Sequence, residues 1–360
     1  MEERIYDIAI VGAGPAGANF ARLIDSKKYT VAIIDGSEGH DKVCGGLLSP
    51  DAQDVLARYD ISLPCDLLAS PQLFSVRTID LGNGYVRHYR RSYMNVDRSK
   101  FDSFVRSLIP QGVDIIDARC KRATRCGDLF ELQTVDGQKI LCKHLVGADG
   151  ASSVVRSGIF KDRKIEKYIA IQQWFDAGKI NPYYSCIFDN DTSSGCSWVF
   201  FKDGMMIFGG AFDKENGREA FESQKQKLID LGFVEKTAFA EPRKTEACLV
   251  CRPHFSGSVF RGDCGAYLLG EAAGFISPSS FEGISYALSS AEALADAFNR
   301  ETGDVDHNRV ARRYKKDTAR LITKIRIRCI KRPFMYDKLL RRAVMKSGLT
   351  SIKIRSNINK

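Results

Sequence analysis

The first forty residues alternate between short apolar runs and small or polar turns. Apolar runs with β-branched residues predict strands over residues 5–11 and 29–34. The stretch between them predicts a turn over residues 12–17 and a helix over residues 18–25, and Asp35 follows the second strand. This order of strand, glycine turn, helix, strand and acid predicts the opening βαβ unit of a dinucleotide-binding domain.

The turn contains three glycines at the spacing that such a unit requires. Gly12 permits the tight turn, Gly14 allows the backbone to approach a pyrophosphate, and Gly17 lets the helix pack close to the strand. The helix start offers free N–H groups to the phosphates, and Asp35, 23 residues after Gly12, would accept hydrogen bonds from a ribose. The alternative, a glycine-rich turn in an ordinary α/β domain, leaves the spacing unexplained. The residues predicted to bind the nucleotide here are Gly12, Gly14, Pro15, Ala16, Gly17, Asp35 and Gly36.

Two later stretches also run from a strand into a small-residue turn. Residues 145–156 and 266–274 each predict a strand followed by a turn that carries a carboxylate. A further glycine turn then begins a long helix that reaches about residue 298, and its N-terminus is directed toward whatever the glycines surround. The residues singled out in these turns are Asp149, Gly150, Gly270, Glu271, Gly283 and Ile284.

The remaining pattern predicts short strands and a few helices. Runs rich in β-branched and aromatic residues predict strands over residues 74–81, 85–89, 113–116, 118–125, 129–134, 139–142, 168–175, 183–188, 197–201 and 205–211. The last four alternate in polarity, which predicts an antiparallel sheet. Helices are expected over residues 51–59, 95–108, 215–231, 304–328 and 335–345, with a break near Pro333.

Composition is that of an ordinary globular protein with room for two domains. The chain has 360 residues, 44% of them hydrophobic and 27% charged. It has no run of 18 apolar residues and no signal-peptide pattern, and its eleven cysteines are scattered, so we expect a cytoplasmic protein with reduced thiols. The CxxC motif at Cys248 and Cys251 has no second pair of ligands nearby, so no metal site is predicted.

Positive charge is concentrated at the C-terminal end of the chain. Residues 301–360 contain 18 Lys and Arg against 5 Asp and Glu, a net charge of +13, whereas the rest carries 36 basic and 39 acidic residues, a net charge of −3. This tail has three interpretations: a solvated helical surface, a nucleic-acid surface, or a surface that docks on anionic membrane. Membrane docking is preferred because Leu321, Ile322, Ile325 and Cys329 fall on one helical face among basic residues, and no aromatic stacking pattern supports nucleic acid.

The three turns near residues 14, 149 and 271 resemble the FAD-binding fold shared by aromatic hydroxylases, flavin halogenases and geranylgeranyl reductases. The resemblance implies an α/β fold, α+β overall, with a Rossmann-like FAD-binding domain, a discontinuous antiparallel-sheet substrate domain and a C-terminal helical tail. The implied boundaries are 1–72, 96–163 and 252–300 for the FAD-binding domain, 73–95 and 164–251 for the substrate domain, and 301–360 for the basic helical region. The first turn would hold the ADP half of FAD, and the other two would lie by the ribityl chain and pyrophosphate.

Within this fold the chain is most similar to the geranylgeranyl reductase branch. Cys44-Gly45-Gly46 resembles the Cys-Gly-Gly segment of those reductases, and GEAAG…P…EGI resembles their late motif. Trp198-Val199-Phe200 resembles part of their lipid-pocket YxWxFP motif, with Cys196 at the Tyr position and Phe201 at the Pro position. The whole chain is identified as a member of the CbrA family of FAD-dependent oxidoreductases through CGGLLSPDAQ, SLIP, LVGADGASS, YIAIQQWF, YSCIFDN and GEAAGFISPSS.

The residues themselves predict roles for Cys44 and for the glycine turns, and the resemblance implies one for Arg98. Cys44 would lie beside the flavin and act in catalysis, either protonating a carbon or steering the substrate, unless it is only a packed thiol. Arg98 would contact the FAD phosphate or ribityl region, and Gly283 and Ile284 would offer N–H groups to the reduced flavin. A solvated helix charge and plain helix capping are the respective alternatives. Gly45 and Gly46 would pass close to the flavin.

An apolar substrate pocket is expected over the flavin. Trp174, Trp198, Phe200 and Phe208 lie on predicted strands of the second domain, where ordinary core packing is the competing interpretation. Strand alternation would place Trp198 and Phe200 on one face and Phe201 on the other.

The predicted function is an FAD-dependent reductase of carbon–carbon double bonds in an isoprenoid or other apolar, lipid-like substrate. The external reductant is open, with NAD(P)H and a ferredoxin-type donor both compatible, and a peripheral membrane location would suit a lipid substrate. A flavin-dependent monooxygenase or halogenase of the same fold is one alternative. A flavin-containing binding or sensing protein without turnover is the other.

Overall fold

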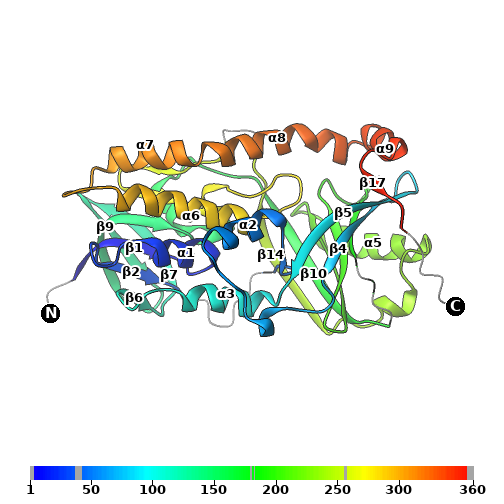
Figure 1. Cartoon of the computed structure of the whole chain (residues 1–360), viewed down its shortest axis with the longest axis horizontal. Coiled ribbons are helices and arrows are strands. Elements are labelled where there is room, and N and C mark those ends of the chain that lie inside the picture. Colours follow the sequence, from blue (N-terminus) through cyan, green and yellow to red (C-terminus); the bar gives the residue numbers. More distant parts are fainter. Residues whose placement is uncertain (1–3, 37–42, 179–180, 182, 255–257, 355–360) are drawn as a thin grey trace.

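The computed structural model describes residues 4–36, 43–178, 181, 183–254 and 258–354. The parts of the predicted domains that fall at 1–3, 37–42, 179–180, 182, 255–257 and 355–360 lie outside these residues. Two sheets lie side by side along the long axis of the molecule, and helices cover them (Figure 1). The architecture confirms the predicted fold class, a Rossmann-like unit joined to an antiparallel sheet with a helical C-terminal region.

The first sheet is mainly parallel, and its central strands are buried on both faces. Its order is β15-β16-β9-β1-β2-β6, with β8 pairing with β9 and β7 with β8. Val11 of β1 pairs with Gly147 of β9, and Gly147 pairs with Leu268 of β16, so three neighbouring strands end level with one another. The strands are β1 Ile5–Val11, β2 Val31–Ile34, β6 Val113–Ile116, β7 Cys120–Cys126, β8 Leu129–Thr134, β9 Lys139–Gly147, β15 Gly262–Asp263 and β16 Ala266–Leu268.

Helices pack on this sheet because their apolar sides face it. Helix α6 is buried along most of its length because α1, α2 and α7 all contact it. The long α helices in this part are α1 Pro15–Leu23, α2 Pro50–Arg58, α3 Arg98–Ser107 and α6 Ile284–Asn299. Shorter helices are η1 Cys65–Leu67, η2 Gly150–Ser152, α4 Val154–Ile159 and η5 Gly270–Ala273.

The second sheet is mainly antiparallel and presents two different faces. Phe201, Phe208 and Phe212 pack with Phe221 of α5 in a core on one face, whereas Phe200 belongs to a separate cluster on the other. The order is β14-β10-β13-β12-β11-β4-β5-β17, and β3 also pairs with β5. The elements are β3 Leu47–Leu48, β4 Leu73–Asp80, β5 Tyr85–Asn95, β10 Lys167–Asp176, β11 Tyr184–Phe188, β12 Ser197–Lys202, β13 Met205–Phe212, β14 Lys244–Cys251, β17 Ser351–Ile352, α5 Gly217–Asp230 and η3 Lys236–Phe239.

The C-terminal helices differ from their prediction. Helix α7 (His307–Asp317) ends at Thr318, α8 (Ala319–Tyr336) continues through Pro333, and α9 (Lys338–Ser347) follows. The predicted break near Pro333 is wrong, because α8 continues through this exposed proline and ends three residues later, at Tyr336. No helix in the described part of the chain is long and apolar enough to cross a membrane.

The apolar face that was predicted to dock on membrane is also placed differently. Ile322, Ile325 and Cys329 are buried in the core of the first sheet and its helices, and Leu321 packs against that core. These residues therefore fix α8 to the protein rather than to a lipid surface.

Helix α9 is fastened to the second sheet by a buried ion pair. The Arg341 guanidinium contacts the Asp80 carboxylate through Nε at 2.8 Å and through Nη2 at 3.0 Å, and both side chains are almost fully buried. Arg341 also donates to Asn190 Oδ1 at 2.7 Å and to the Met335 carbonyl at 2.9 Å. Although burial opposes ionisation, Arg341 and Asn83 hold the pKa of Asp80 below its usual value.

We expect Arg341→Met to lower the free energy of unfolding by about 3–5 kcal/mol, because it leaves the Asp80 charge buried without its partner. Arg342→Met, which replaces an exposed neighbour, should change it by less than about 0.5 kcal/mol. Urea titrations of both variants measure the difference. Equal losses in the two variants would contradict this role for the pair.

Candidate active site

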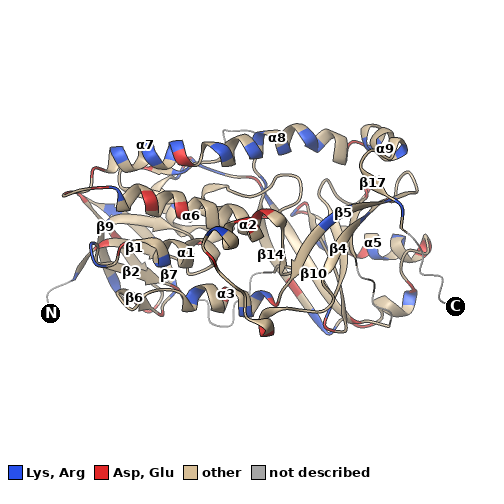
Figure 2. Cartoon of the chain, in the orientation of Figure 1, with Lys and Arg blue, Asp and Glu red and all other residues tan. Residues whose placement is uncertain are grey.

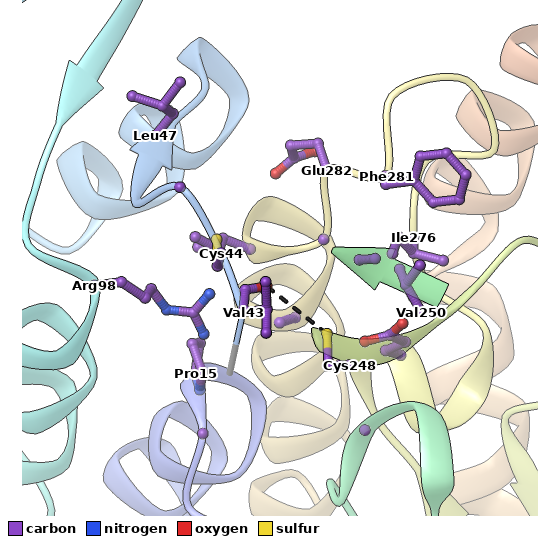
Figure 3. A pocket seen from close by; sticks show the side chains of 18 of the residues that line it. Pro15, Val43, Cys44, Leu47, Arg98, Cys248, Val250, Ile276, Phe281 and Glu282 are labelled. Atoms are coloured by element: carbon purple, nitrogen blue, oxygen red, sulfur yellow. Dashed lines mark hydrogen bonds between the residues drawn. The ribbon is translucent and has the colours of Figure 1, made fainter. Parts of the chain in front are cut away.

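One large cavity lies between the two sheets and receives residues from both. Its volume is about 1640 Å³, which exceeds the ~300–1,000 Å³ of pockets that hold one small ligand. The wall includes the turns after β1 and β9, the start of α6, the loop at Val43–Gly45 and the cavity-facing side of the second sheet (Figure 3). The cavity therefore has room for an extended cofactor and a second molecule.

The first turn uses its glycines in two ways. A Cβ on Gly12, whose φ is +95°, would lie 2.8 Å from the Ala148 carbonyl oxygen, and one on Gly17 would lie 1.8 Å from the Gly12 carbonyl oxygen. Both glycines are thus required for packing. A Cβ on Gly14 would meet no atom within 4 Å, and Gly14 lines the cavity where α1 begins. This position leaves space for a phosphate beside the free N–H groups of the helix.

Asp35 lines the cavity at the end of β2 and is paired with a basic residue that the sequence analysis did not single out. Arg106 Nη1 of α3 donates to Asp35 Oδ2 at 2.8 Å. Arg98, Asp102 and Arg106 are spaced four residues apart, so one side of α3 faces the cavity. That spacing was a signal available in the sequence. Gly36 lines the same region, and a Cβ there would lie 2.6 Å from the Arg119 nitrogen.

Asp149 offers an acceptor that nothing in the described protein satisfies. Its Oδ2 accepts from the N–H groups of Val154 at 2.6 Å and Val155 at 3.2 Å, whereas its Oδ1 is buried without a hydrogen-bond partner. Burial raises the pKa of this carboxyl above its usual value. Because Asp149 lines the cavity, its orphaned oxygen fits a hydroxyl donor such as those of FAD.

The late turn is fixed mainly by contacts within the protein. Glu271 Oε1 accepts from the Cys251 N–H at 2.7 Å, which ties β14 of the second sheet to η5. The buried Arg156 donates to the carbonyls of Ala272 at 2.6 Å and Ala151 at 2.7 Å, and so joins the second and third turns. Arg156 is a further positioning residue that the sequence analysis left without a role.

The Cys-Gly-Gly loop is held against the second sheet by a buried lysine. Lys202 Nζ donates to the carbonyls of Gly45 at 2.8 Å and Val96 at 2.5 Å. A Cβ on Gly45 would lie 2.6 Å from the Phe200 ring, and one on Gly46 would lie 2.1 Å from the Val96 carbonyl oxygen. Burial lowers the pKa of Lys202 to about 8. These contacts fix Cys44 at the cavity wall.

Arg98 and Cys248 lie on opposite sides of this loop. The guanidinium of Arg98 points toward the turn at Pro15 and the segment with Val43 and Cys44 (Figure 3), and its Nε donates to Asp102 at 2.9 Å. Cys248 Sγ lies 3.9 Å from the Val43 carbonyl oxygen. Since Cys248 and Cys251 are three residues apart on β14, they point to opposite faces, and only Cys248 lines the cavity.

The aromatic residues predicted for the substrate pocket divide into two groups. Trp198 and Phe200 line the cavity, as strand alternation predicted, and Phe201 packs on the other face. Phe208 does not line it, because its partner Val199 lies between those two residues and therefore points away. Trp174 shares the cavity-facing side of the sheet but packs in the cluster with Phe200, and its Nε1 donates to Glu246 Oε2 at 2.7 Å.

The cavity brings together most of the predicted site residues. Those in its wall are Gly12, Gly14, Pro15, Ala16, Asp35, Gly36, Cys44, Gly45, Arg98, Asp149, Gly150, Trp198, Phe200, Glu271, Gly283 and Ile284. Those outside its wall are Gly17, Gly46, Trp174, Phe208 and Gly270. The wall also includes Phe334 and Met335 of α8 and Val344 and Met345 of α9, which the sequence analysis did not assign to the site.

Comparisons with known proteins agree with this geometry. Residues 6–173 match the family described as pyridine nucleotide-disulphide oxidoreductase. The chain is 40% identical to Protein CbrA of Escherichia coli O6:H1 (strain CFT073) over 96% of this chain and 94% of the relative. It resembles the structure of a geranylgeranyl bacteriochlorophyll reductase-like protein from Thermoplasma acidophilum, with a TM-score of 0.80, 18% identity, and coverage of 99% of this chain and 94% of that chain.

A second structural neighbour belongs to another class of flavoenzyme. PqsL, described as a probable FAD-dependent monooxygenase from Pseudomonas aeruginosa, gives a TM-score of 0.69 at 16% identity, with coverage of 95% of this chain and 100% of that chain. At 18% and 16% identity, these two neighbours establish the fold of this chain alone and not its reaction.

We expect Gly14→Ala to weaken FAD binding at least about tenfold, which corresponds to about 1.4 kcal/mol, because its methyl group would occupy the space beside the α1 N-terminus. The apoprotein should lose less than about 1 kcal/mol of stability, since a Cβ there meets nothing. Flavin fluorescence quenching measures the affinity. Gly178→Ala is the matched control, because its Cβ is equally free of neighbours outside the cavity. Unchanged FAD affinity in Gly14→Ala would show that the FAD phosphate does not bind beside this turn.

Lys202 should give stability a distinctive pH dependence. The unfolded chain holds this proton up to about pH 10.5, whereas the folded protein releases it above about pH 8. The unfolded state therefore binds more protons between these values, and wild-type stability should rise through this window by about 3 kcal/mol relative to Lys202→Met. Denaturant titrations across the window test this. Lys121→Met, at an exposed position on β7, should show no such difference from wild type, and a flat difference for Lys202→Met would contradict the burial of its charge.

Proposed function

The chain belongs to the CbrA family, and we propose that it is an FAD-dependent reductase that saturates carbon–carbon double bonds of an isoprenoid or similarly apolar, lipid-like substrate. One observation carries the proposal. A single cavity extends from the turns after β1, β9 and β16, which would hold the cofactor, to a wall of Tyr184, Trp198 and Phe200 and to apolar residues of α8 and α9. An apolar chain would bury its surface against that wall.

The protein's own groups account for binding and orientation of the cofactor. The α1 N-terminus and Gly14 would receive the pyrophosphate, Asp35 a ribose, and the unpaired Asp149 oxygen a hydroxyl of the ribityl region. Arg98 would neutralise phosphate charge at the cavity wall. FAD supplies the electrons when it is bound.

Cys44 is the group placed to complete the reaction. Saturation of one double bond adds two electrons and two protons, of which one proton arrives with the electrons. The Cys44 thiol would donate the other proton to the second carbon and recover it from water. Lys202 and the Gly45 contact with Phe200 hold Cys44 between the cofactor region and the apolar wall.

The resemblance of the fold to the reductase-like protein from Thermoplasma acidophilum supports the proposed reaction class, while the monooxygenase fold of PqsL keeps a second outcome in view. The test incubates FAD-loaded protein with a chemical reductant and isoprenoid lipids in the absence of oxygen. Mass spectrometry should show lipids heavier by two hydrogens per double bond. Products that form only in air and carry an added oxygen would indicate a monooxygenase, and no change in any lipid would favour a binding or sensing protein.

The external electron donor is tested in the same system. NAD(P)H and a reduced ferredoxin can be compared as replacements for the chemical reductant by following the bleaching of the flavin absorbance. The donor that supports lipid reduction at the higher rate is the better candidate.

We expect Cys44→Ser to reduce lipid turnover by about 100-fold while FAD content stays the same, because a hydroxyl is a much weaker proton donor than a thiol. Cys65→Ser, which changes an exposed thiol outside the cavity, should have wild-type turnover. Single-turnover reduction of the lipid by prereduced protein measures both. Equal turnover in the two variants would exclude Cys44 from the mechanism.

A further inference from the structure

Exposed apolar side chains gather at the C-terminal helices. Within the described part of the chain, nine of the fifteen large apolar side chains that are exposed fall between residues 327 and 354. Leu339 and Leu349 are among the most exposed, at 72% and 70%. A cluster of this kind is unusual on a surface that faces only water, and it indicates an interaction site.

Packing within the molecule does not explain the cluster. Ile322, Ile325 and Cys329 already bury one side of α8 in the core. Ile327, Ile330 and Phe334 follow at helical spacing but lie on an exposed side. Helix α8 therefore has two apolar sides, and only one of them is covered by the protein.

The charge of this region is nearly all positive. Between residues 319 and 354 the sequence has eleven Lys and Arg and a single acid, Asp337. Figure 2 shows the basic residues along α8 and α9 at the edge of the molecule. Apolar side chains surrounded by basic ones are the pattern of helices that lie in the interface of an anionic membrane.

The cavity described above opens beside the same cluster. Phe334 of α8 and Val344 of α9 are exposed and also line the cavity. The exposed Arg90 and Arg91 of β5 line it as well. A lipid held at this surface would have a direct route to the aromatic wall at Trp198.

We propose that this surface docks the protein on an anionic phospholipid bilayer and admits the lipid substrate from it. The docking surface consists of Ile327, Ile330, Phe334, Leu339, Leu340 and Leu349, with Arg342 and Lys346 between them. Docking itself does not depend on the proposed function; only the identity of the lipid that enters the cavity rests on it.

The chemistry of the surface argues against other occupants. A second copy of the chain would bring the same positive charges into contact, which opposes association at low salt. A nucleic acid would satisfy the charge but leave the exposed leucines and isoleucines without an apolar partner. An anionic bilayer supplies both an apolar interior and negative headgroups.

The experiment is flotation of the FAD-loaded protein with vesicles of phosphatidylcholine alone or with added phosphatidylglycerol, at moderate salt. Wild type should float with the anionic vesicles and remain below with the neutral ones. Leu339→Ser/Leu349→Ser should reduce the partition coefficient at least tenfold, and Arg342→Gln/Lys346→Gln should reduce binding to anionic vesicles most at low salt. The matched control, Val135→Ser/Leu231→Ser, replaces two exposed apolar side chains elsewhere and should bind as wild type.

Wild type that stays below with anionic vesicles, or a Leu339→Ser/Leu349→Ser variant that floats like wild type, would overturn the proposal. If wild type does not float but forms a dimer, and Leu339→Ser/Leu349→Ser is monomeric, the surface would bind a second copy of the chain. That result would also overturn the proposal. Lipid reduction in detergent is measured separately on the same samples. Protein that floats but reduces no lipid keeps the docking surface and rejects the proposed function, and the reverse result rejects only the docking.

Discussion

Level register of three parallel strands is the constraint on which the rest of the structure depends. Because Val11, Gly147 and Leu268 pair across β1, β9 and β16, the turns that follow these strands emerge at one edge of the sheet. The backbones of the first two turns then approach so closely that Gly12 has no room for a side chain beside Ala148. An extended, anionic cofactor can be held there by main-chain N–H groups, since the helix start at Pro15 faces the same space.

The second sheet completes the site through a small number of polar contacts with the first. Glu271 reaches the Cys251 N–H of β14, and Lys202 of β12 reaches the Gly45 carbonyl. In each contact a buried charged side chain forms a hydrogen bond with a backbone group on the other side of the cavity. A shift between the sheets would break these bonds and leave the buried polar groups without partners. The apolar wall at Trp198 and Phe200 is thereby kept at a fixed distance from the cofactor turns. Function in this account depends on that fixed relation.

The sequence was sufficient for features that depend on local backbone chemistry. The glycine turn after β1, the carboxylates at Asp149 and Glu271, and most strands follow from residue types whose effects act over a few positions. The alternation that separates Trp198 and Phe200 from Phe201 was also confirmed. The assignment of the chain to the CbrA family rested on longer motifs and was confirmed by the comparison with relatives.

Features that depend on partners distant in the sequence were not predictable in this way. Phe208 was assigned to the pocket because the register between β12 and β13, which turns it into the core, cannot be read from one strand. The helix that carries Ile322 and Ile325 is amphipathic whether its apolar side faces lipid or protein. Only the tertiary structure shows that this side faces the core. Lys202 has no role in the sequence analysis, because the two carbonyls that accept its hydrogen bonds, those of Gly45 and Val96, come from segments distant in the sequence. The predicted domain boundaries stay a prediction, and β3 and β17 pair with the second sheet from segments assigned elsewhere.

The central claim is that FAD lies across the three turns at the edge of the first sheet. The most direct measurement is the amount of flavin released when the purified protein is denatured, identified by mass spectrometry and compared with the protein concentration. We expect the protein to release FAD, at one molecule per chain after incubation with excess cofactor. Protein that releases no FAD after that incubation, while remaining folded by circular dichroism, would contradict it.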